Sequence, residues 1–144
     1  ILDSHTYRTI EYYLYNYHEL KKEVEEKRKS IMLGGSSEIK DWSDNISLSD
    51  PTANKVIQLF NDDITVTESW LSVIEKTCEY FRGTHKGKLI KLRYFKGMDE
   101  QPICRVLYIS RATYYNWRND IIMYVALLAQ KYDLIDIEKC AEGS

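Results

Sequence analysis

Apolar side chains recur at helical spacing along most of this chain, and no stretch alternates strictly between apolar and polar residues. The first stripe lies within 5–32, where Ile10, Tyr17, Val24 and Ile31 recur every seven residues without an interrupting Pro or Gly. Such a repeat is typical of an amphipathic α-helix, whereas strict alternation is typical of a strand. We therefore predict an all-α fold that begins with one long helix.

The second half of this long helix is charged on nearly every side apart from Val24. A helix that is polar over most of its surface either projects into solvent or pairs along a narrow apolar seam. One interpretation is a coiled-coil arm through which the chain forms a homo-oligomer, although Lys27 interrupts the seam. The other is a helix that packs on the body of its own domain, and the pattern leaves both open.

A polar stretch then divides the chain. Residues 34–50 are rich in Ser, Asp and Gly and show little periodicity, which predicts a linker. The expected organisation is therefore the long helix over 1–33, this linker, and a helical domain over 51–144.

Three further helices are expected between the linker and residue 94. The apolar stripes predict them over 51–60, 65–81 and 86–94, the first opening with a proline in its first turn. The Asn-Asp-Asp run at 61–63 is expected to separate the first two, its paired aspartates capping the second helix.

The stretch 99–119 predicts a helix-turn-helix. Ile103 and Leu107 lie one turn apart on a first short helix, and Ile109 fills the turn that follows. Ser110 is a good N-cap for the second helix, because its hydroxyl can accept a free backbone N–H there.

The second helix of this motif is expected to have a core face and an outward face. Tyr114 and Trp117 face the core, and the apolar stripe continues through Ile121 and Val125, so one helix should reach about Tyr132. The polar residues that face outward on its first turns are Ser110, Arg111, Thr113, Tyr115, Asn116 and Asn119.

Groups of this kind can bind DNA from a helix in the major groove. Arg111 and Asn116 are expected to contact bases, because their side chains match guanine and adenine edges through bidentate hydrogen bonds. Residues expected at the phosphate backbone are Ser110, Thr113, Tyr115, Arg118 and Asn119, with Lys86, Lys88, Lys91 and Arg105 adding positive field. The expected partner is double-stranded DNA, although any helical hairpin has similar apolar spacing.

The charge distribution favours the DNA interpretation. From Arg82 to Arg118 there are nine Lys or Arg against only Asp99 and Glu100, so this segment carries +7 in a chain of net charge −2. A basic segment in an otherwise acidic chain is the expected footprint of phosphate binding.

Other function classes find little support. Cys78, Cys104 and Cys140 form no CxxC pair and the three histidines are scattered, so we expect no metal, no cofactor and no enzymatic activity. Unpaired cysteines suit a reducing cytoplasm. No signal peptide is visible, and no apolar run approaches the roughly 20 residues of a membrane span. We expect a cytoplasmic protein bound to DNA and not to a membrane.

Residues 89–118 resemble region four of sigma factors, with the sequence LIKLRYFKGMDEQPICRVLYISRATYYNWR. The resemblance lies in a short helix ending in Leu-Arg-Tyr and a helix-turn-helix whose second helix opens at Ser110 and Arg111. With the long charged helix and the polar linker, the layout resembles the RinA/ArpU group of phage-encoded transcriptional activators. This resemblance implies a sigma-like fold and activation of phage late genes, with RNA polymerase open as a second partner.

One position departs from the helix-turn-helix pattern. Tyr108 occupies the turn position that is usually glycine. It must therefore adopt a positive φ at some cost or reshape the turn.

Two other functions stay open. Small terminase subunits, which package DNA, also join a helix-turn-helix to helical oligomerisation segments, and sequence separates them poorly from activators. A helical protein-interaction adaptor without DNA contact is the third alternative, and it predicts no salt-sensitive affinity for DNA.

Overall fold

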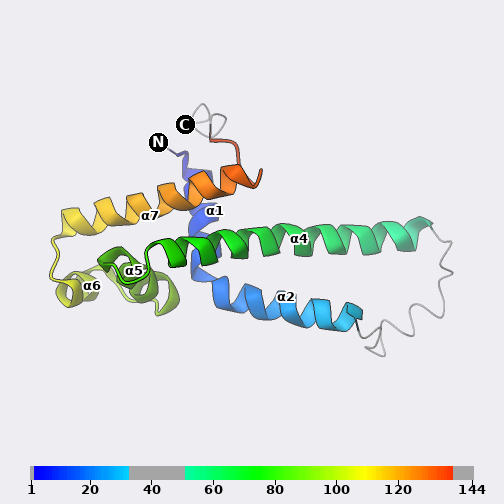
Figure 1. The fold of residues 1–144 in the computed structure, drawn as a ribbon, viewed down its shortest axis with the longest axis horizontal. Helices are drawn as coiled ribbons and strands as arrows, with labels where there is room; N and C mark the ends of the chain where they lie inside the picture. The colour runs from blue at the N-terminus through cyan, green and yellow to red at the C-terminus, as the bar shows by residue number, and fades with distance from the viewer. Residues whose placement is uncertain (1, 33–50, 138–144) are drawn as a thin grey trace. The chain divides into compact units, whose positions relative to one another are not determined.

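The computed structural model describes residues 2–32 and 51–137, and every regular element in these two ranges is helical (Figure 1). The expected all-α fold is confirmed for this part of the chain. The expected linker over 34–50 lies outside the described residues. The elements in order are α1 (Ser4–Tyr15), α2 (Tyr17–Met32), α4 (Pro51–Tyr80), α5 (His85–Ile90), the π-helix η1 (Lys91–Phe95), α6 (Glu100–Leu107) and α7 (Arg111–Lys131).

The N-terminal region forms two helices, so the prediction of one long helix was wrong. α1 ends at Tyr15 and α2 begins at Tyr17, and Asn16 between them has φ −104° and ψ 12°. The Asn16 side chain donates from Nδ2 to the Tyr12 carbonyl at 2.8 Å. The Asn16 backbone N–H also donates to this carbonyl at 3.0 Å, so the side chain adds a second local bond, the kind of bond that favours Asn at helix ends over helix interiors.

α4 runs without interruption from Pro51 to Tyr80, so the expected separation at 61–63 was also wrong. Asp62 and Asp63 are exposed within the helix and do not cap a new one. Asn or Asp in a helix interior costs only up to about 0.7 kcal/mol relative to Ala, and no Pro or Gly lies here. Burial of the next residue, Ile64, offsets that cost.

The helices contribute to two compact units, which divide the chain elsewhere than expected. The larger unit comprises Ile1–His18 and Ser69–Ser144, and the smaller comprises Glu19–Glu68. The reason is visible in α1, whose Ile10 and Leu14 are fully buried. α1 therefore belongs to the C-terminal helical body rather than to a separate N-terminal arm.

In the smaller unit, α2 packs against the first part of α4. Arg28 forms an ion pair with Glu68, and Val24 and Ile64 are buried. Of the two interpretations of the charged helix, these contacts support packing within the chain. Self-association through this region stays a prediction.

A tight connection joins α4 to α5 in the larger unit. The Thr84 hydroxyl caps α5 by accepting the Gly87 N–H at 3.1 Å. A Cβ on Gly87 would lie 2.4 Å from the Phe81 carbonyl oxygen, so this close backbone approach requires glycine. α5 continues directly into η1, and Gly97 follows with φ 70°. The expected short helix over 86–94 is therefore present, with a wider final turn.

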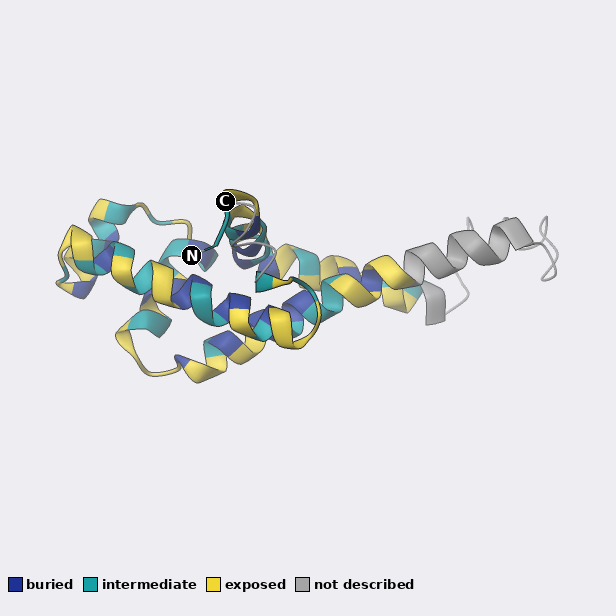
Figure 2. Cartoon of the chain, turned by 90° about the horizontal axis from the view of Figure 1, so that it is seen from above, coloured by how far each residue is buried: buried dark blue, intermediate teal, exposed yellow. Residues whose placement is uncertain are grey.

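Buried and exposed positions recur in short groups along the described helices, as packing of amphipathic helices requires (Figure 2). α7 runs as one helix to Lys131, as the apolar stripe predicted. Tyr114 is buried as expected, but Trp117 is only partly buried. The buried stripe passes from Tyr114 to Ile121 and Val125, and Trp117 lies beside it.

Candidate nucleic-acid interface

The connection between α6 and α7 consists of only residues 108–110, and Figure 1 shows the two helices meeting there. Tyr108 has φ 55° and ψ 47°, so it adopts the positive φ, and its N–H bonds the Cys104 carbonyl. Ser110 caps α7 as predicted, since its Oγ accepts the Thr113 N–H at 3.1 Å. A cap of this kind fixes where the second helix begins.

The first turns of α7 present one clearly exposed face. Ala112, Asn116 and Asn119 are all exposed, at spacings of four and three residues that place them on one side of a helix. No hydrogen bond or ion pair involves Asn116 within the described part of the chain. Ala112 is an addition to the predicted set, because a search for polar side chains does not find an exposed alanine.

The adjacent side of α7 carries Arg111 and Tyr115, which meet a carboxylate from α6. The Arg111 Nε lies 2.9 Å from Glu100 Oε1, and the Tyr115 hydroxyl donates to Glu100 Oε2 at 2.6 Å. Contact with Tyr115 and the negative charge of Glu100 raise the pKa of Arg111. The sequence pattern indicated Glu100 only as a charge that opposes the basic segment, so its place beside Arg111 was missed.

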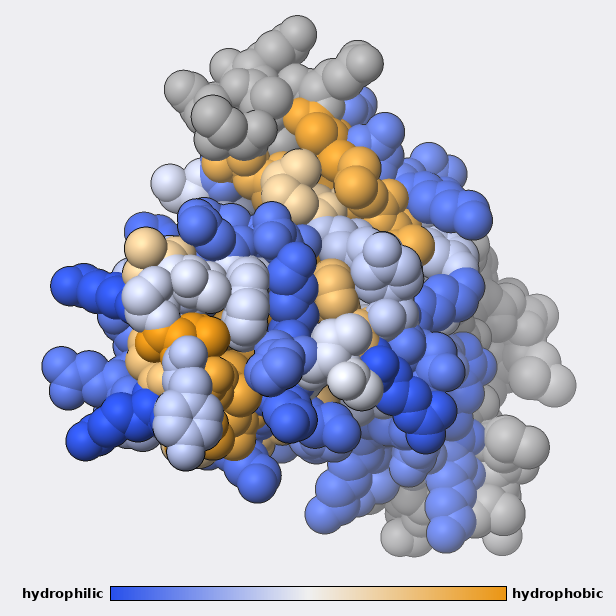
Figure 3. All heavy atoms as spheres, turned by 60° about the vertical axis from the view of Figure 1, so that its left-hand side comes forward, coloured by the Kyte–Doolittle hydropathy of each residue, from blue (hydrophilic) through white to orange (hydrophobic). Residues whose placement is uncertain are grey.

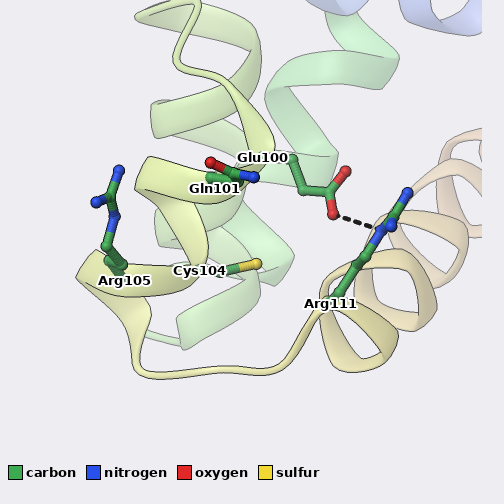
Figure 4. A pocket seen from close by; sticks show the side chains of 5 residues that line it. All are labelled: Glu100, Gln101, Cys104, Arg105 and Arg111. Atoms are coloured by element: carbon green, nitrogen blue, oxygen red, sulfur yellow. Dashed lines mark ion pairs between the residues drawn. The ribbon is translucent and has the colours of Figure 1, made fainter.

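An open pocket of about 520 Å³ adjoins this cluster (Figure 4). The residues that line it are Glu100, Gln101, Cys104, Arg105 and Arg111. Arg105 is exposed and comes from the last turn of α6, so the structure brings two predicted cationic residues to the same pocket. Burial is the main cause that raises the pKa of the Cys104 thiol.

Arg118 does not lie at this surface, contrary to its predicted phosphate role. Its guanidinium bonds both carboxylate oxygens of Glu11 on α1, at 2.9 to 3.2 Å. The side chains are only 20% and 14% exposed. One face of α7 carries Arg111, Tyr115 and Arg118. Arg118, the last of the three, contacts α1 instead of solvent.

Asn119 and Lys86 have intramolecular partners as well. Asn119 Oδ1 accepts a hydrogen bond from the Tyr7 hydroxyl at 3.1 Å. Lys86 Nζ lies 3.0 Å from Asp120 Oδ2, which balances part of its charge. Asn119 on α7 and Lys86 on α5 therefore have less capacity for phosphate than isolated side chains would have.

The remaining predicted cations are dispersed. Lys88 and Lys91 are exposed on α5 and η1. Burial raises the pKa of the Cys78 thiol on α4, and the positive charge of Lys91 opposes this effect. No described contact connects either lysine to the cluster around Arg111.

The end of α6 and the turn after it add an apolar component. Val106 is 55% exposed and Tyr108 is 94% exposed, although both precede the polar start of α7. Figure 3 looks onto the side where α6 and the start of α7 lie, and it shows hydrophobic surface among hydrophilic side chains. The candidate interface is therefore mixed rather than uniformly polar.

No group of three or more His, Cys, Asp or Glu side chains is placed to hold a metal ion among residues 2–32 and 51–137. Within the same ranges, no helix combines the length and apolar character needed to cross a membrane. Comparison with protein-family models, curated proteins and solved structures found no match to this chain.

Proposed function

We propose that this chain is a sequence-specific DNA-binding protein that docks the first turns of α7 in the major groove. The observation that carries the proposal is the short connection from α6 to a capped α7 whose exposed face starts beside the cap. In helix-turn-helix proteins the second helix reads base edges with its N-terminal residues while the first helix crosses the backbone.

The proposed contacts follow the geometry. Arg111 and Asn116 contact base edges, guanine for the arginine and adenine for the asparagine. Ala112 lies between them on the exposed face and contacts a thymine methyl group. Ser110 and Thr113 bind phosphate close to the helix N-terminus, where backbone N–H groups also favour anions.

The cations around the site have different proposed roles. Arg105 binds backbone phosphate, since it is exposed in the pocket beside Arg111. Lys88 and Lys91 add longer-range attraction. Arg118 and Asn119 hold α7 against α1, and we assign them no phosphate contact.

The biological role that we propose is activation of phage late genes. It rests on the likeness of residues 89–118 to sigma region four, the part of the resemblance to the RinA/ArpU group that does not depend on one long N-terminal helix. An activator of this class would contact RNA polymerase while bound beside a promoter.

The test is selection of bound sequences from a random duplex pool, followed by affinity measurements across a salt series. Because Arg118 and Lys86 are already paired, we expect only about four phosphate contacts, hence about a hundredfold loss of affinity between 50 and 200 mM salt. Flat salt dependence with no enriched sequence would refute the proposal.

A pair of charge variants makes this test local. Arg105→Gln should reduce the slope of log affinity against log salt by about one. Lys131→Gln removes the same charge at the opposite end of α7 and should leave the slope unchanged. Equal effects of the two variants would mean that net charge, rather than this surface, attracts the DNA.

A further inference from the structure

We propose that Glu100 is a specificity-determining residue that positions Arg111 for one mode of guanine contact and weakens binding to all other DNA. The inference rests on the proposed function, since it concerns the same surface. Glu100 is a carboxylate among basic side chains, and a surface that only attracted phosphate would have no use for its negative charge.

The first observation is that Glu100 uses its two oxygens on two different residues. Oε1 lies 2.9 Å from the Arg111 Nε, and Oε2 accepts from the Tyr115 hydroxyl at 2.6 Å. The carboxylate is mostly covered, with 24% of the side chain exposed, whereas Arg111 is 77% exposed. Figure 4 shows the arginine extending toward Glu100 across the pocket.

The carboxylate itself is well anchored. Glu100 is the first residue of α6, where the helix dipole favours a negative charge. Tyr115 lies one turn after Arg111 on α7, and the guanidinium carbon is 5.7 Å from the centre of its ring. Arg111 is thus held by a charge at Nε and by an aromatic ring beside its guanidinium group.

This arrangement selects one edge of the guanidinium. An arginine can present two parallel N–H groups to guanine O6 and N7 through different edges of its planar fork. With Nε directed at Glu100, the terminal nitrogens Nη1 and Nη2 remain for that contact. A positioned arginine also loses less conformational entropy on binding than a free one.

The same carboxylate opposes non-specific binding. A negative charge this close to the helix N-terminus repels any phosphate that approaches Arg111 without the correct base. Removing the charge should therefore strengthen binding to random DNA while weakening discrimination. A merely structural role would lower both affinities together.

The experiment measures the dissociation constants of the full chain for its selected duplex and for a random duplex at one salt concentration. Glu100→Gln keeps the shape but removes the charge, and we expect tighter binding to random DNA and a specificity ratio reduced about tenfold or more. Glu79→Gln removes a carboxylate on α4 that pairs with Arg82 and touches neither Glu100 nor Arg111, so it should leave the ratio unchanged.

A double-mutant cycle tests whether Glu100 acts through Arg111. Arg111→Lys removes the bidentate fork and keeps the charge. Repulsion of phosphate by Glu100 does not need the arginine fork, but positioning does, so Glu100→Gln should lower the specificity ratio less in the Arg111→Lys background than in the unaltered chain. Equal effects of Glu100→Gln on the ratio in the two backgrounds would overturn the inference.

Two further outcomes keep the inference separate from the proposed function. An unchanged specificity ratio in Glu100→Gln overturns the role of Glu100 and leaves sequence-specific binding intact. Absence of salt-sensitive DNA binding by the unaltered chain refutes the proposed function itself.

If Glu100→Gln fails to fold, Tyr115→Phe replaces it, since loss of one Glu100 contact should lower the specificity ratio without tightening binding to random DNA. An unchanged ratio in that variant overturns the inference as well.

Discussion

Two buried tyrosines of the larger unit differ in a single respect, their hydroxyl partners. Tyr94 donates to Glu11 Oε2 at 2.8 Å, and burial followed by the charge of Glu11 raises the pKa of this phenol. The hydroxyl therefore stays protonated and remains a donor at neutral pH. Tyr114 is 1% exposed, yet its hydroxyl has no hydrogen-bond partner among the described residues.

This difference predicts that replacing each tyrosine by phenylalanine changes the unfolding free energy differently. Tyr94→Phe should cost about 1.5–3 kcal/mol of unfolding free energy, because a hydrogen bond to a charged group is lost. Tyr114→Phe should be neutral or slightly stabilising, because it removes a buried group that gains nothing. Urea unfolding monitored by circular dichroism measures both. A loss in Tyr114→Phe as large as that in Tyr94→Phe would show that Tyr114 has a partner after all.

Residue-scale features differ in how far the sequence predicts them. The Ser110 cap was predictable because a serine and the helix that it caps are adjacent in the chain. The contact between Glu11 and Arg118 joins residues 107 positions apart, and no local pattern indicates it. Glu100 is closer to Arg111, but only the angle between α6 and α7 brings their side chains together.

At the scale of the helices, the turn between α6 and α7 carries a measurable conformational cost. A non-glycine residue in the left-handed region costs roughly 1–2 kcal/mol, and Tyr108 occupies that region with almost no burial in return. The turn therefore tolerates glycine better than the helix just before it does.

Glycine substitutions at these two nearby positions should therefore change the unfolding free energy in opposite directions. Tyr108→Gly should raise the unfolding free energy by up to about 1 kcal/mol, because the backbone strain is relieved. Val106→Gly, at an exposed position inside α6, should lower it by about 0.3–0.5 kcal/mol, the difference in helix propensity between valine and glycine. Thermal and urea unfolding of the two variants give the comparison. Destabilisation by both would mean that the Tyr108 side chain makes a stabilising contact.

The helical elements themselves were largely predictable, and their breaks were not. Asn16 ends α1, whereas the Asn-Asp-Asp run at 61–63 leaves α4 continuous. Local propensity is similar at both places, so the outcome depends on whether the side chain bonds the backbone or faces solvent. Packing around the residue decides which of the two occurs, and local sequence does not indicate that packing.

At the scale of the whole molecule, α1 is part of the body that carries the candidate interface. Leu14 is fully buried, whereas Tyr12 on the same helix is largely exposed. Leu14→Ala should cost about 2–5 kcal/mol, as expected for a large-to-small substitution in a core. Tyr12→Ala should change the unfolding free energy by about 0.5 kcal/mol or less. Equal small effects in urea unfolding would indicate that α1 is detachable, as a separate N-terminal arm would be.

Composition and periodicity gave the fold class but not this division into units. The larger unit joins residues 1–18 to residues from 69 onward, with the smaller unit between them in the chain. The sequence pattern indicates which face of α1 is apolar and leaves open which distant helix covers it. The expected arm and linker followed from treating neighbours in sequence as neighbours in space.

The discontinuous larger unit has a consequence for synthesis on the ribosome. Domains form from the N-terminus as the chain emerges, at roughly 5–20 residues per second. The partners of α1, in η1 and α7, are among the later segments to appear, whereas Glu19–Glu68 can form its own contacts first. The apolar face of α1, with Ile10 and Leu14, therefore stays uncovered until η1 and α7 have been made, and nascent chains stalled before α7 should be the form most readily bound by chaperones.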